Sequence, residues 1–274
     1  MDVRPILFMD SGVGGLPYCR DFLKNNPLEE ICYLADRYNF PYGQRDKNEL
    51  TSILIELIKK MLQVCDPKII VLACNTATVS SLDALRSHFV NIPFVGTVPA
   101  IKPALNASKN GKVGILGTAR TIDDPYIKKL TQDNAAQEKN NCGITAIAAP
   151  DLVEFVELYF DRASEEEKTD IVKKYINIFR DEGVDTLVLG CTHFLYLLEE
   201  FRREASPDIT IYDSLDGITK RIEFLLNENN NAMRSSAESA PFHKLIITGN
   251  KAADTVWENR AYSLGFKLSL LKDL

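Results

Sequence analysis

The sequence lacks several features that mark common functional classes. It has three histidines, one tryptophan and no CxxC pair among its six cysteines, so no zinc cage of the usual spacing is visible. Positive charge is not in excess, because 32 Lys and Arg stand against 38 Asp and Glu, for a formal net charge of −6. This balance argues against a protein that binds nucleic-acid phosphates through a basic surface.

Long apolar runs are also missing. No stretch approaches the roughly 18 apolar residues that cross a bilayer. The first apolar run is interrupted by Asp10 and Gly12, and no small-residue cleavage site of a signal peptide follows it. We therefore expect a cytoplasmic protein with no membrane partner and with free thiols. Its 274 residues, 45% of them hydrophobic, suffice for one large domain or two modest ones.

Short apolar runs alternate with amphipathic stretches, and several of the apolar runs are apolar on both faces. This pattern predicts an α/β fold with parallel sheets covered by helices. The predicted strands are residues 6–9, 31–34, 69–73, 94–95, 113–116, 145–148, 186–189, 210–212 and 245–248. The predicted helices are residues 16–24, 49–64, 79–89, 125–133, 152–160, 164–180, 195–204 and 215–226.

Local signals set the predicted helix starts and loops. Asn48 or Thr51, Ser164 and Ser214 are candidate N-caps. Residues 131–143 and 228–241 are polar, lack periodicity and are predicted to be surface loops.

Two pairs of similar segments recur in the same order along the chain. IIVLACNTAT (69–78) and TLVLGCTHFL (186–195) each place a cysteine between an apolar strand and the start of a helix. ILFMDSG (6–12) and VGILGTA (113–119) each end a strand in a turn that contains Ser or Thr. The repeats predict two similar α/β lobes.

Cys74 and Cys191 are the strongest candidates for chemistry. Ligands of open α/β sheets bind at the carboxyl ends of the strands, and a helix N-terminus lowers the pKa of a thiol placed there. Short polar residues follow each of the two cysteines, among them Asn75, Thr76, Thr192 and His193. The other four cysteines are better interpreted as small buried hydrophobes.

Further polar residues follow other predicted strands. Asp10 and Ser11 begin a glycine-rich turn that would let the backbone approach a ligand, although Asp10 could instead cap a helix. This DSGVGG turn lacks the lysine of a P-loop and is not a GxGxxG fingerprint, so no nucleotide site is predicted. Thr118 and Thr121 supply small donors or cap a helix, and FPYG (40–43) indicates a rigid turn.

Two further groups could assist Cys191. His193 could move a proton beside it or bind a substrate. Glu157, on a predicted helix, is either a carboxylate near that site or a solvated surface residue.

Together these motifs resemble those of the glutamate racemases, within the aspartate/glutamate racemase superfamily. The matching segments are MDSGVGGL (9–16), FPYG (40–43), ACNTAT (73–78), VGTVPAIKPA (95–104), GILGTARTI (114–122) and LGCTHF (189–194). The resemblance implies two pseudo-symmetric flavodoxin-like lobes with parallel sheets and the active site in the cleft between them. It assigns residues 1–97 and 211–274 to the first lobe and residues 98–210 to the second.

The resemblance also implies a reaction, the cofactor-independent interconversion of L- and D-glutamate that supplies D-glutamate for peptidoglycan. Cys74 and Cys191 would be the two acid/base residues on opposite faces of the α-carbon, with Asp10 and His193 as auxiliary partners and Glu157 as a third. No metal is implied. The substrate-binding residues implied by the matching motifs are Asp10, Ser11, Pro41, Tyr42, Gly43, Asn75, Thr76, Thr118, Thr121, Thr192 and His193.

The sequence departs from the family pattern near Glu157, with Ala149 where the family often has Cys, and with Glu154 and Leu195 where it often has Pro. The VPAIKPA segment resembles a Gram-negative subgroup, some of whose members need an activator, a UDP-linked muramoyl-alanine precursor. Family members differ in whether they form a homodimer. The alternatives are a cysteine hydrolase that uses Cys191 and His193, a silent module that binds acidic amino acids, and an aspartate racemase.

Overall fold

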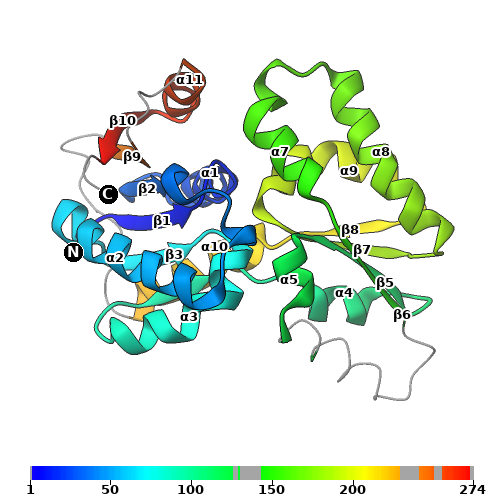
Figure 1. The fold of residues 1–274 in the computed structure, drawn as a ribbon, viewed down its shortest axis with the longest axis horizontal. Coiled ribbons are helices and arrows are strands. Elements are labelled where there is room, and N and C mark those ends of the chain that lie inside the picture. The colour runs from blue at the N-terminus through cyan, green and yellow to red at the C-terminus, as the bar shows by residue number, and fades with distance from the viewer. Residues whose placement is uncertain (1, 126–128, 130–142, 229–240, 250–254, 272–274) are drawn as a thin grey trace. The chain divides into compact units, whose positions relative to one another are not determined.

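The computed structural model describes residues 2–125, 129, 143–228, 241–249 and 255–271 of the chain. They form two compact units (Figure 1), Met1–Thr97 with Leu215–Leu274 and Val98–Ser214. Each unit contains one sheet in which all neighbouring strands are parallel, so the predicted α/β class is confirmed. None of the helices in the described ranges is long and apolar enough to cross a membrane.

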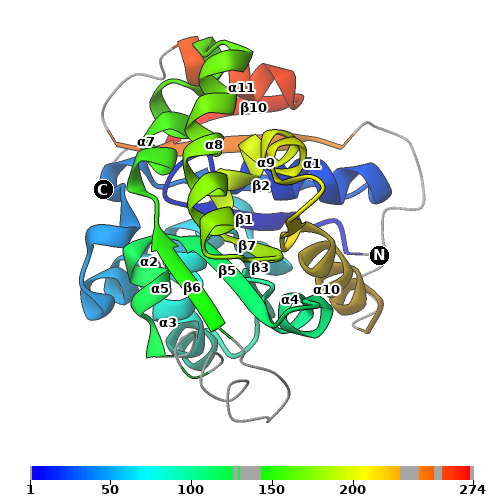
Figure 2. The ribbon, with the colours of Figure 1, turned by 90° about the vertical axis from the view of Figure 1, so that its right-hand side faces the viewer.

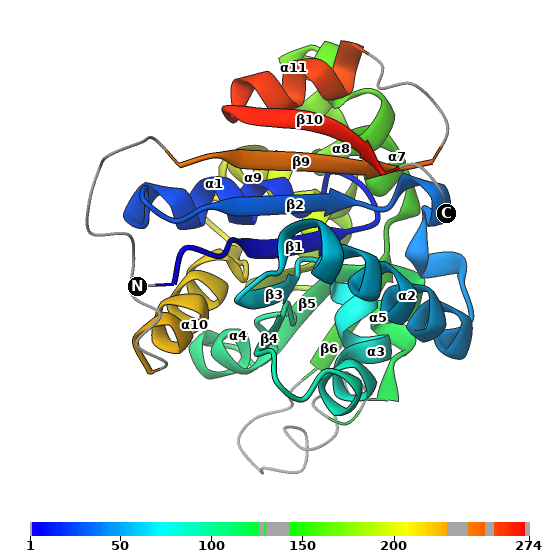
Figure 3. The same ribbon diagram turned by 90° about the vertical axis from the view of Figure 1, so that its left-hand side faces the viewer.

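The sheet of the first unit has six strands in the order β10-β9-β2-β1-β3-β4 (Figure 3). Every residue of the three central strands is buried, which explains why these runs are apolar on both faces. The strands are β1 (Ile6–Asp10), β2 (Ile31–Ala35), β3 (Ile69–Leu72), β4 (Phe94–Gly96), β9 (His243–Thr248) and β10 (Phe266–Leu271).

Helices pack on both faces of this sheet. Leu7 and Met9 join the core formed with α2 and α3, whereas Phe8, between them, contacts Phe22 of α1 on the other face. The alternation follows from the two-residue period of a strand. The helices are α1 (Leu16–Asn25), η1 (Arg37–Asn39), η2 (Tyr42–Gln44), α2 (Lys47–Cys65), α3 (Asn75–His88), α10 (Leu215–Glu228) and α11 (Thr255–Ser263).

The second unit contains a four-stranded sheet in the order β6-β5-β7-β8, part of which is visible in Figure 2. Its strands are β5 (Lys112–Gly117), β6 (Gly143–Ala148), β7 (Thr186–Gly190) and β8 (Thr210–Tyr212). Its helices are α4 (Ile101–Ala107), α5 (Ala119–Asp123), α7 (Pro150–Leu158), η3 (Phe160–Arg162), α8 (Glu165–Asp181), η4 (Thr192–Leu197) and α9 (Leu198–Ala205).

The two sheets share the plan that the sequence repeats indicate. The order β2-β1-β3-β4 in the first unit corresponds to β6-β5-β7-β8 in the second. In this correspondence the two segments that end in Ser or Thr form β1 and β5, and the two segments that end in cysteine form β3 and β7. Because β8 pairs with β7, the chain re-enters the first unit at Leu215, four residues later than the predicted return at 211.

Several local predictions need correction. The N-cap of α2 is Asp46, whose carboxylate accepts from the amides of Asn48 and Glu49, so neither Asn48 nor Thr51 caps this helix. Ser164 does cap α8, in a reciprocal capping box with Glu167. The sequence pattern does not indicate α4, α5, α11 and β10, because these elements are short or weakly periodic. The predicted helix 125–133 and the loops 131–143 and 228–241 lie largely outside the described residues.

A buried ion pair lies just before two of the central strands of the first unit. The Nζ of Lys68 is 2.6 Å from an Oε of Glu29, and both side chains are 1% exposed. Lys68 also donates to the backbone oxygen of Asp2. Removing one partner of such a pair leaves an uncompensated buried charge.

We predict that Lys68→Met lowers the free energy of unfolding by about 3–5 kcal/mol, because Glu29 then stays buried without its counter-charge. Urea denaturation at neutral pH measures the loss. The control is Lys220→Met, which removes an exposed ion pair with Asp216 and should leave stability nearly unchanged. Equal stabilities of the two variants would contradict the prediction.

Candidate active site

Polar residues gather at the carboxyl end of the first unit's sheet. Asp10 ends β1 and Ser11 follows it, the turn of Pro41, Tyr42 and Gly43 follows β2, and Cys74 comes two residues after β3. Because β1 lies between β2 and β3 and all three run in parallel, these three loops leave the same edge of the sheet. The structure therefore brings the predicted site residues of this unit together.

Cys74 stands at the start of α3. It is the N-cap residue, with extended backbone (φ −144°, ψ 117°), and its carbonyl accepts the first helical hydrogen bond from Thr78. Its side chain is buried among the core residues of the unit. The first amides of a helix have no partner within the helix and carry partial positive charge, so this position favours an anion or a thiolate.

Asn75, the first residue of α3, has a side chain whose polar atoms are unsatisfied. The residue is 3% exposed, and within the described part of the chain neither its Nδ2 nor its Oδ1 has a hydrogen-bond partner. A buried amide without partners costs free energy. A ligand that supplies both a donor and an acceptor, as an amino acid does, would satisfy it.

The turn after β1 is held by internal hydrogen bonds. The Asp10 carboxylate accepts from the Gly12 amide at 2.8 Å and from the Ser11 hydroxyl at 3.4 Å. Asp10 does not cap α1, whose N-cap is Gly15. A Cβ on Gly15 would lie 2.7 Å from the Cβ of Ala73, so this glycine is needed for the close approach of the turn to the end of β3.

A second carboxylate, Asp36, fixes the turn after β2. It is fully buried and accepts hydrogen bonds from the Tyr42 hydroxyl at 2.8 Å, from the Asn39 amide at 2.9 Å and from the Thr248 hydroxyl at 2.6 Å. Asp36 is not among the residues predicted from the sequence. The available signal was its place directly after the buried strand β2, one residue beyond the register partner of Asp10.

Tyr42 links this network to the candidate site. Burial raises the pKa of its phenol well above the usual value, and the charge of Asp36 and the hydrogen bond to it act in the same direction. The charges of Cys74 and Asp10 raise it further, so the phenol lies within electrostatic range of both. Tyr42 is therefore a neutral hydrogen-bond donor at neutral pH.

In the second unit, three side chains form a chain of polar contacts. Cys191 is the N-cap residue of η4, and its sulfur lies 3.8 Å from Nδ1 of His193. The Nε2 of His193 lies 2.7 Å from Oε1 of Glu157 on α7. The His193 and Glu157 side chains are 5% and 8% exposed. Of the two alternatives that the sequence allowed for Glu157, a solvated surface residue is therefore excluded. Thr192 is also buried.

The environment of His193 favours its charged form. Burial alone lowers the pKa of the imidazole, but the hydrogen bonds to the Cys191 sulfur and to the Glu157 carboxylate outweigh burial and raise that pKa well above its usual value. A protonated ring between a sulfur and a carboxylate stabilises negative charge on the sulfur.

Thr118 and Thr121 take part in a helix cap, which is one of the two roles that the sequence allowed for them. Thr118 is the N-cap of α5, and its hydroxyl accepts from the Thr121 amide at 3.2 Å. Since Gly117 and Gly190 are register partners on β5 and β7, Thr118 and Cys191 follow neighbouring strands. Ser11 and Cys74 do the same in the first unit. A contact of either threonine with substrate stays a prediction.

The predicted residues therefore fall into two groups, one in each unit. Neither group contains a metal site of three or more His, Cys, Asp or Glu side chains, as far as the described ranges extend.

Comparison with known proteins gives consistent matches. The model of the Asp/Glu/Hydantoin racemase family matches residues 19–221. Glutamate racemase of Shewanella frigidimarina is 35% identical over 249 residues, which are 91% of this chain and 93% of that protein.

Two solved structures resemble the whole chain. Escherichia coli glutamate racemase, in complex with L-glutamate and the activator UDP-MurNAc-ala, superposes with a TM-score of 0.83 at 30% identity, over 97% of each chain. Glutamate racemase isoform RacE1 of Bacillus anthracis gives a TM-score of 0.80 at 29% identity, over 100% of this chain and 99% of that one.

We predict that Glu157→Gln lowers the pKa of His193, because the neutral amide no longer stabilises the imidazolium. Nitrogen NMR of the labelled imidazole against pH measures the change. The control is Glu154→Gln, one turn earlier on α7 and exposed, which should leave this titration unchanged. An unaltered His193 titration in Glu157→Gln would show that the carboxylate does not set the pKa.

The raised pKa also predicts how stability varies with pH. Because the folded-state pKa lies above the unfolded value of about 6.5, the contribution of His193 to stability is complete below about pH 6.5 and disappears as pH rises through the folded-state pKa. Urea denaturation across this range should show a smaller decline for Glu157→Gln than for the unmodified protein. Parallel declines would contradict the prediction.

Proposed function

The chain belongs to the Asp/Glu/Hydantoin racemase family, and on that premise we propose that it interconverts L- and D-glutamate by proton transfer at Cα through Cys74 and Cys191. As a member of this family with glutamate racemases as its relatives, it is an amino-acid racemase that acts on glutamate.

The two-cysteine proposal rests on one observation. The two thiols occupy equivalent positions in the two similar sheets. Cys74 follows β3 and Cys191 follows β7, the corresponding strands of the two sheets. Each is an N-cap residue with extended backbone, and they are 7% and 6% exposed. Racemisation removes a proton from one face of Cα and adds one to the other, so one acid/base group on each face avoids turning the substrate.

The reaction begins with one thiolate and one thiol. The thiolate takes the α-proton, the C–H electron pair stays on the substrate as a carbanion, and the thiol on the other face donates its proton to Cα. We assign His193 as the auxiliary partner of Cys191, whose sulfur lies 3.8 Å from the Nδ1 of that imidazole. In the reverse direction the two sulfurs exchange roles, with Asp10 as the auxiliary partner of Cys74.

The α-proton is far less acidic than a thiol, whose ordinary pKa is about 8.5. The site must therefore stabilise charge that builds on the substrate carboxylate as Cα loses its proton. The unsatisfied amide of Asn75 and the hydroxyls of Ser11, Thr76 and Thr192 are the donors that we assign to this role. Donors already fixed in a buried site stabilise such charge without reorganising.

The biological role follows from the same reasoning. We propose that the product is D-glutamate for peptidoglycan, made in the cytoplasm, where thiols stay reduced. The E. coli relative was solved with L-glutamate and the activator UDP-MurNAc-ala, which supports glutamate as the substrate and an activator of this class. We propose no cofactor, because two thiols and the fixed donors supply the proton transfers.

A cysteine hydrolase is the alternative that the second unit favours. Cys191, His193 and Glu157 form the nucleophile, base and orienting carboxylate of such an enzyme. That mechanism would build a thioester on Cys191 and would leave Cys74 without a role. The equivalence of the two cysteines favours the racemase.

We predict that Cys74→Ser and Cys191→Ser each lower kcat for racemisation by about 10²–10⁴-fold, since a hydroxyl is a far weaker acid than a thiol. Each variant should impair proton removal from one enantiomer more than from the other, with opposite preferences. Circular dichroism follows racemisation, and proton NMR in D2O follows loss of the α-proton. Cys65→Ser, outside both groups, serves as the control. Full activity of Cys74→Ser would contradict the mechanism.

We predict that Asn75→Ala separates stability from activity. The alanine removes an unsatisfied buried amide, so the free energy of unfolding should stay the same or rise. The loss of a donor should lower kcat by about 10²–10³-fold. Urea denaturation and racemase kinetics on the same sample test both halves. A large loss of stability would assign Asn75 a structural role instead.

A further inference from the structure

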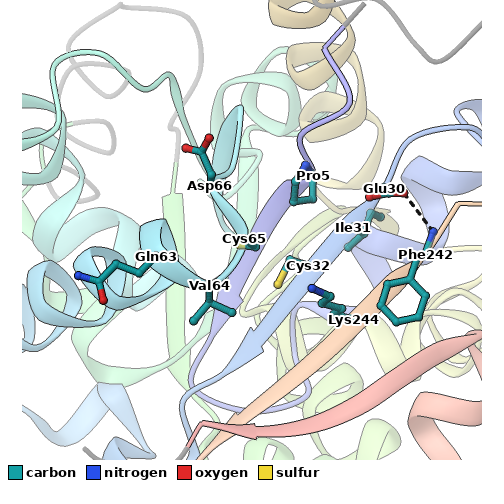
Figure 4. Close-up of a pocket in the computed structure, with 10 residues that line it drawn as sticks. All are labelled: Pro5, Glu30, Ile31, Cys32, Gln63, Val64, Cys65, Asp66, Phe242 and Lys244. Carbon is teal, nitrogen blue, oxygen red and sulfur yellow. Dashed lines mark hydrogen bonds between the residues drawn. The ribbon is translucent and has the colours of Figure 1, made fainter.

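A cavity of about 330 Å³ opens on the first unit at the amino-terminal end of its strands (Figure 4). Cys32 and Lys244 are the second residues of β2 and β9, and both line the cavity. Cys74, in contrast, follows the carboxyl end of β3. The cavity therefore lies at the opposite edge of the sheet from the candidate site.

Two free thiols meet in this cavity. Cys65, the last residue of α2, is half-buried, and Cys32, on β2, is 1% exposed. The Cys65 thiol donates to the carbonyl of Met61 at 3.4 Å. Each of the two thiols shifts the pKa of the other, so the two side chains lie near one another. Figure 4 shows Cys32, Cys65 and the Lys244 ammonium around one space. Two thiols that line one cavity, one reachable and one buried, are a different arrangement from an isolated buried cysteine.

The charges around the pair distinguish its two members. The hydrogen bond from Cys32 lowers the pKa of Cys65, burial opposes this, and the charge of Lys244 lowers it again, while Asp66 acts in the opposite direction. The pKa of Cys32 is raised, first by its hydrogen bond to Cys65 and then by burial. Cys65 is thus the more acidic and the more accessible of the two thiols.

We propose that Cys65 and Cys32 form a redox-active pair, in which a hydroperoxide oxidises Cys65 and Cys32 then closes a disulfide. This inference does not rest on the proposed function. It assigns a modification site to a cavity away from the residues that carry the racemase chemistry.

The chemistry balances with one equivalent of hydroperoxide. The Cys65 thiolate attacks the peroxide, an S–O bond forms, the O–O bond breaks, and the leaving oxygen takes a proton, which gives a sulfenic acid. The sulfur of Cys32 then attacks the Cys65 sulfur, the S–S bond forms, and the S–O bond breaks. Hydroxide leaves and takes the Cys32 proton as water. The two thiols are oxidised to a disulfide. An organic hydroperoxide is reduced to one alcohol and one water, and hydrogen peroxide is reduced to two waters.

The first step also prepares the second. Cys65 is the largest cause of the raised pKa of Cys32, ahead of burial. Conversion of Cys65 to a neutral sulfenic acid removes the charge that its thiolate would place beside Cys32. Lys244 still lowers the pKa of Cys32, so the buried thiol becomes easier to deprotonate when its target is ready.

The test treats the reduced, full-length protein with one equivalent of hydrogen peroxide, blocks the remaining thiols with iodoacetamide, and maps the unreduced peptides by mass spectrometry. We expect the peptides of Cys32 and Cys65 to be joined, and dithiothreitol to separate them. Recovery of both cysteines as alkylated thiols would overturn the proposal. Pairing of Cys65 with another cysteine would overturn it equally.

Variants then test the order of the steps. In Cys32→Ser, dimedone should trap a sulfenic acid on Cys65, whereas in Cys65→Ser it should leave Cys32 unlabelled. Lys244→Met should slow oxidation of Cys65 several-fold. Lys267→Met is the matched control, since both lysines lie 5.7 Å from the ring centre of Phe242 and only Lys244 lines the cavity. Equal rates in the two lysine variants, or labelling of Cys32, would contradict the assigned roles.

Discussion

The parallel arrangement of adjacent strands is the constraint on which the candidate site depends. Because β1, β2 and β3 run in the same direction, the loops after them leave one edge, and β5, β6 and β7 repeat this in the second unit. A cysteine placed directly before the following helix then stands at the N-terminus of that helix. The same geometry applied twice yields two thiols in equivalent settings, one in each unit.

Burial of polar side chains at these strand ends costs free energy, and hydrogen bonds to neighbouring groups offset most of that cost. Asp36 compensates its buried charge with hydrogen bonds from three side chains and thereby fixes the turn of Tyr42. His193 compensates its charge between a sulfur and a carboxylate. Asn75 is the exception, because its amide is not satisfied within the described residues. Polar atoms left unsatisfied in an otherwise satisfied site are expected where a ligand completes the hydrogen bonding.

The sequence predicted the fold class, the repeat and nine of the strands because buried parallel strands are short, apolar runs with clear ends. It predicted Cys74, Cys191 and Asp10 because each stands at such an end. It did not predict Asp36, since the partners Tyr42 and Thr248 come together only when β9 pairs with β2. The role of Glu157 could not be decided from the sequence for a similar reason, because its contact with His193 joins two helical segments that are distant in the sequence. Short elements such as α5 and η4 carry too few residues to show a period.

The central claim is that two sulfurs act on opposite faces of one Cα, and the early course of the reaction in D2O tests it most directly. L-glutamate or D-glutamate is incubated with the unmodified enzyme, the reaction is stopped after a small fraction has turned over, and deuterium at Cα is measured in each enantiomer. With two acid/base groups, the product should carry solvent deuterium while the recovered substrate remains protonated. A product that retains the original α-hydrogen, or deuterium that appears equally in substrate and product, would show a single base and contradict the account.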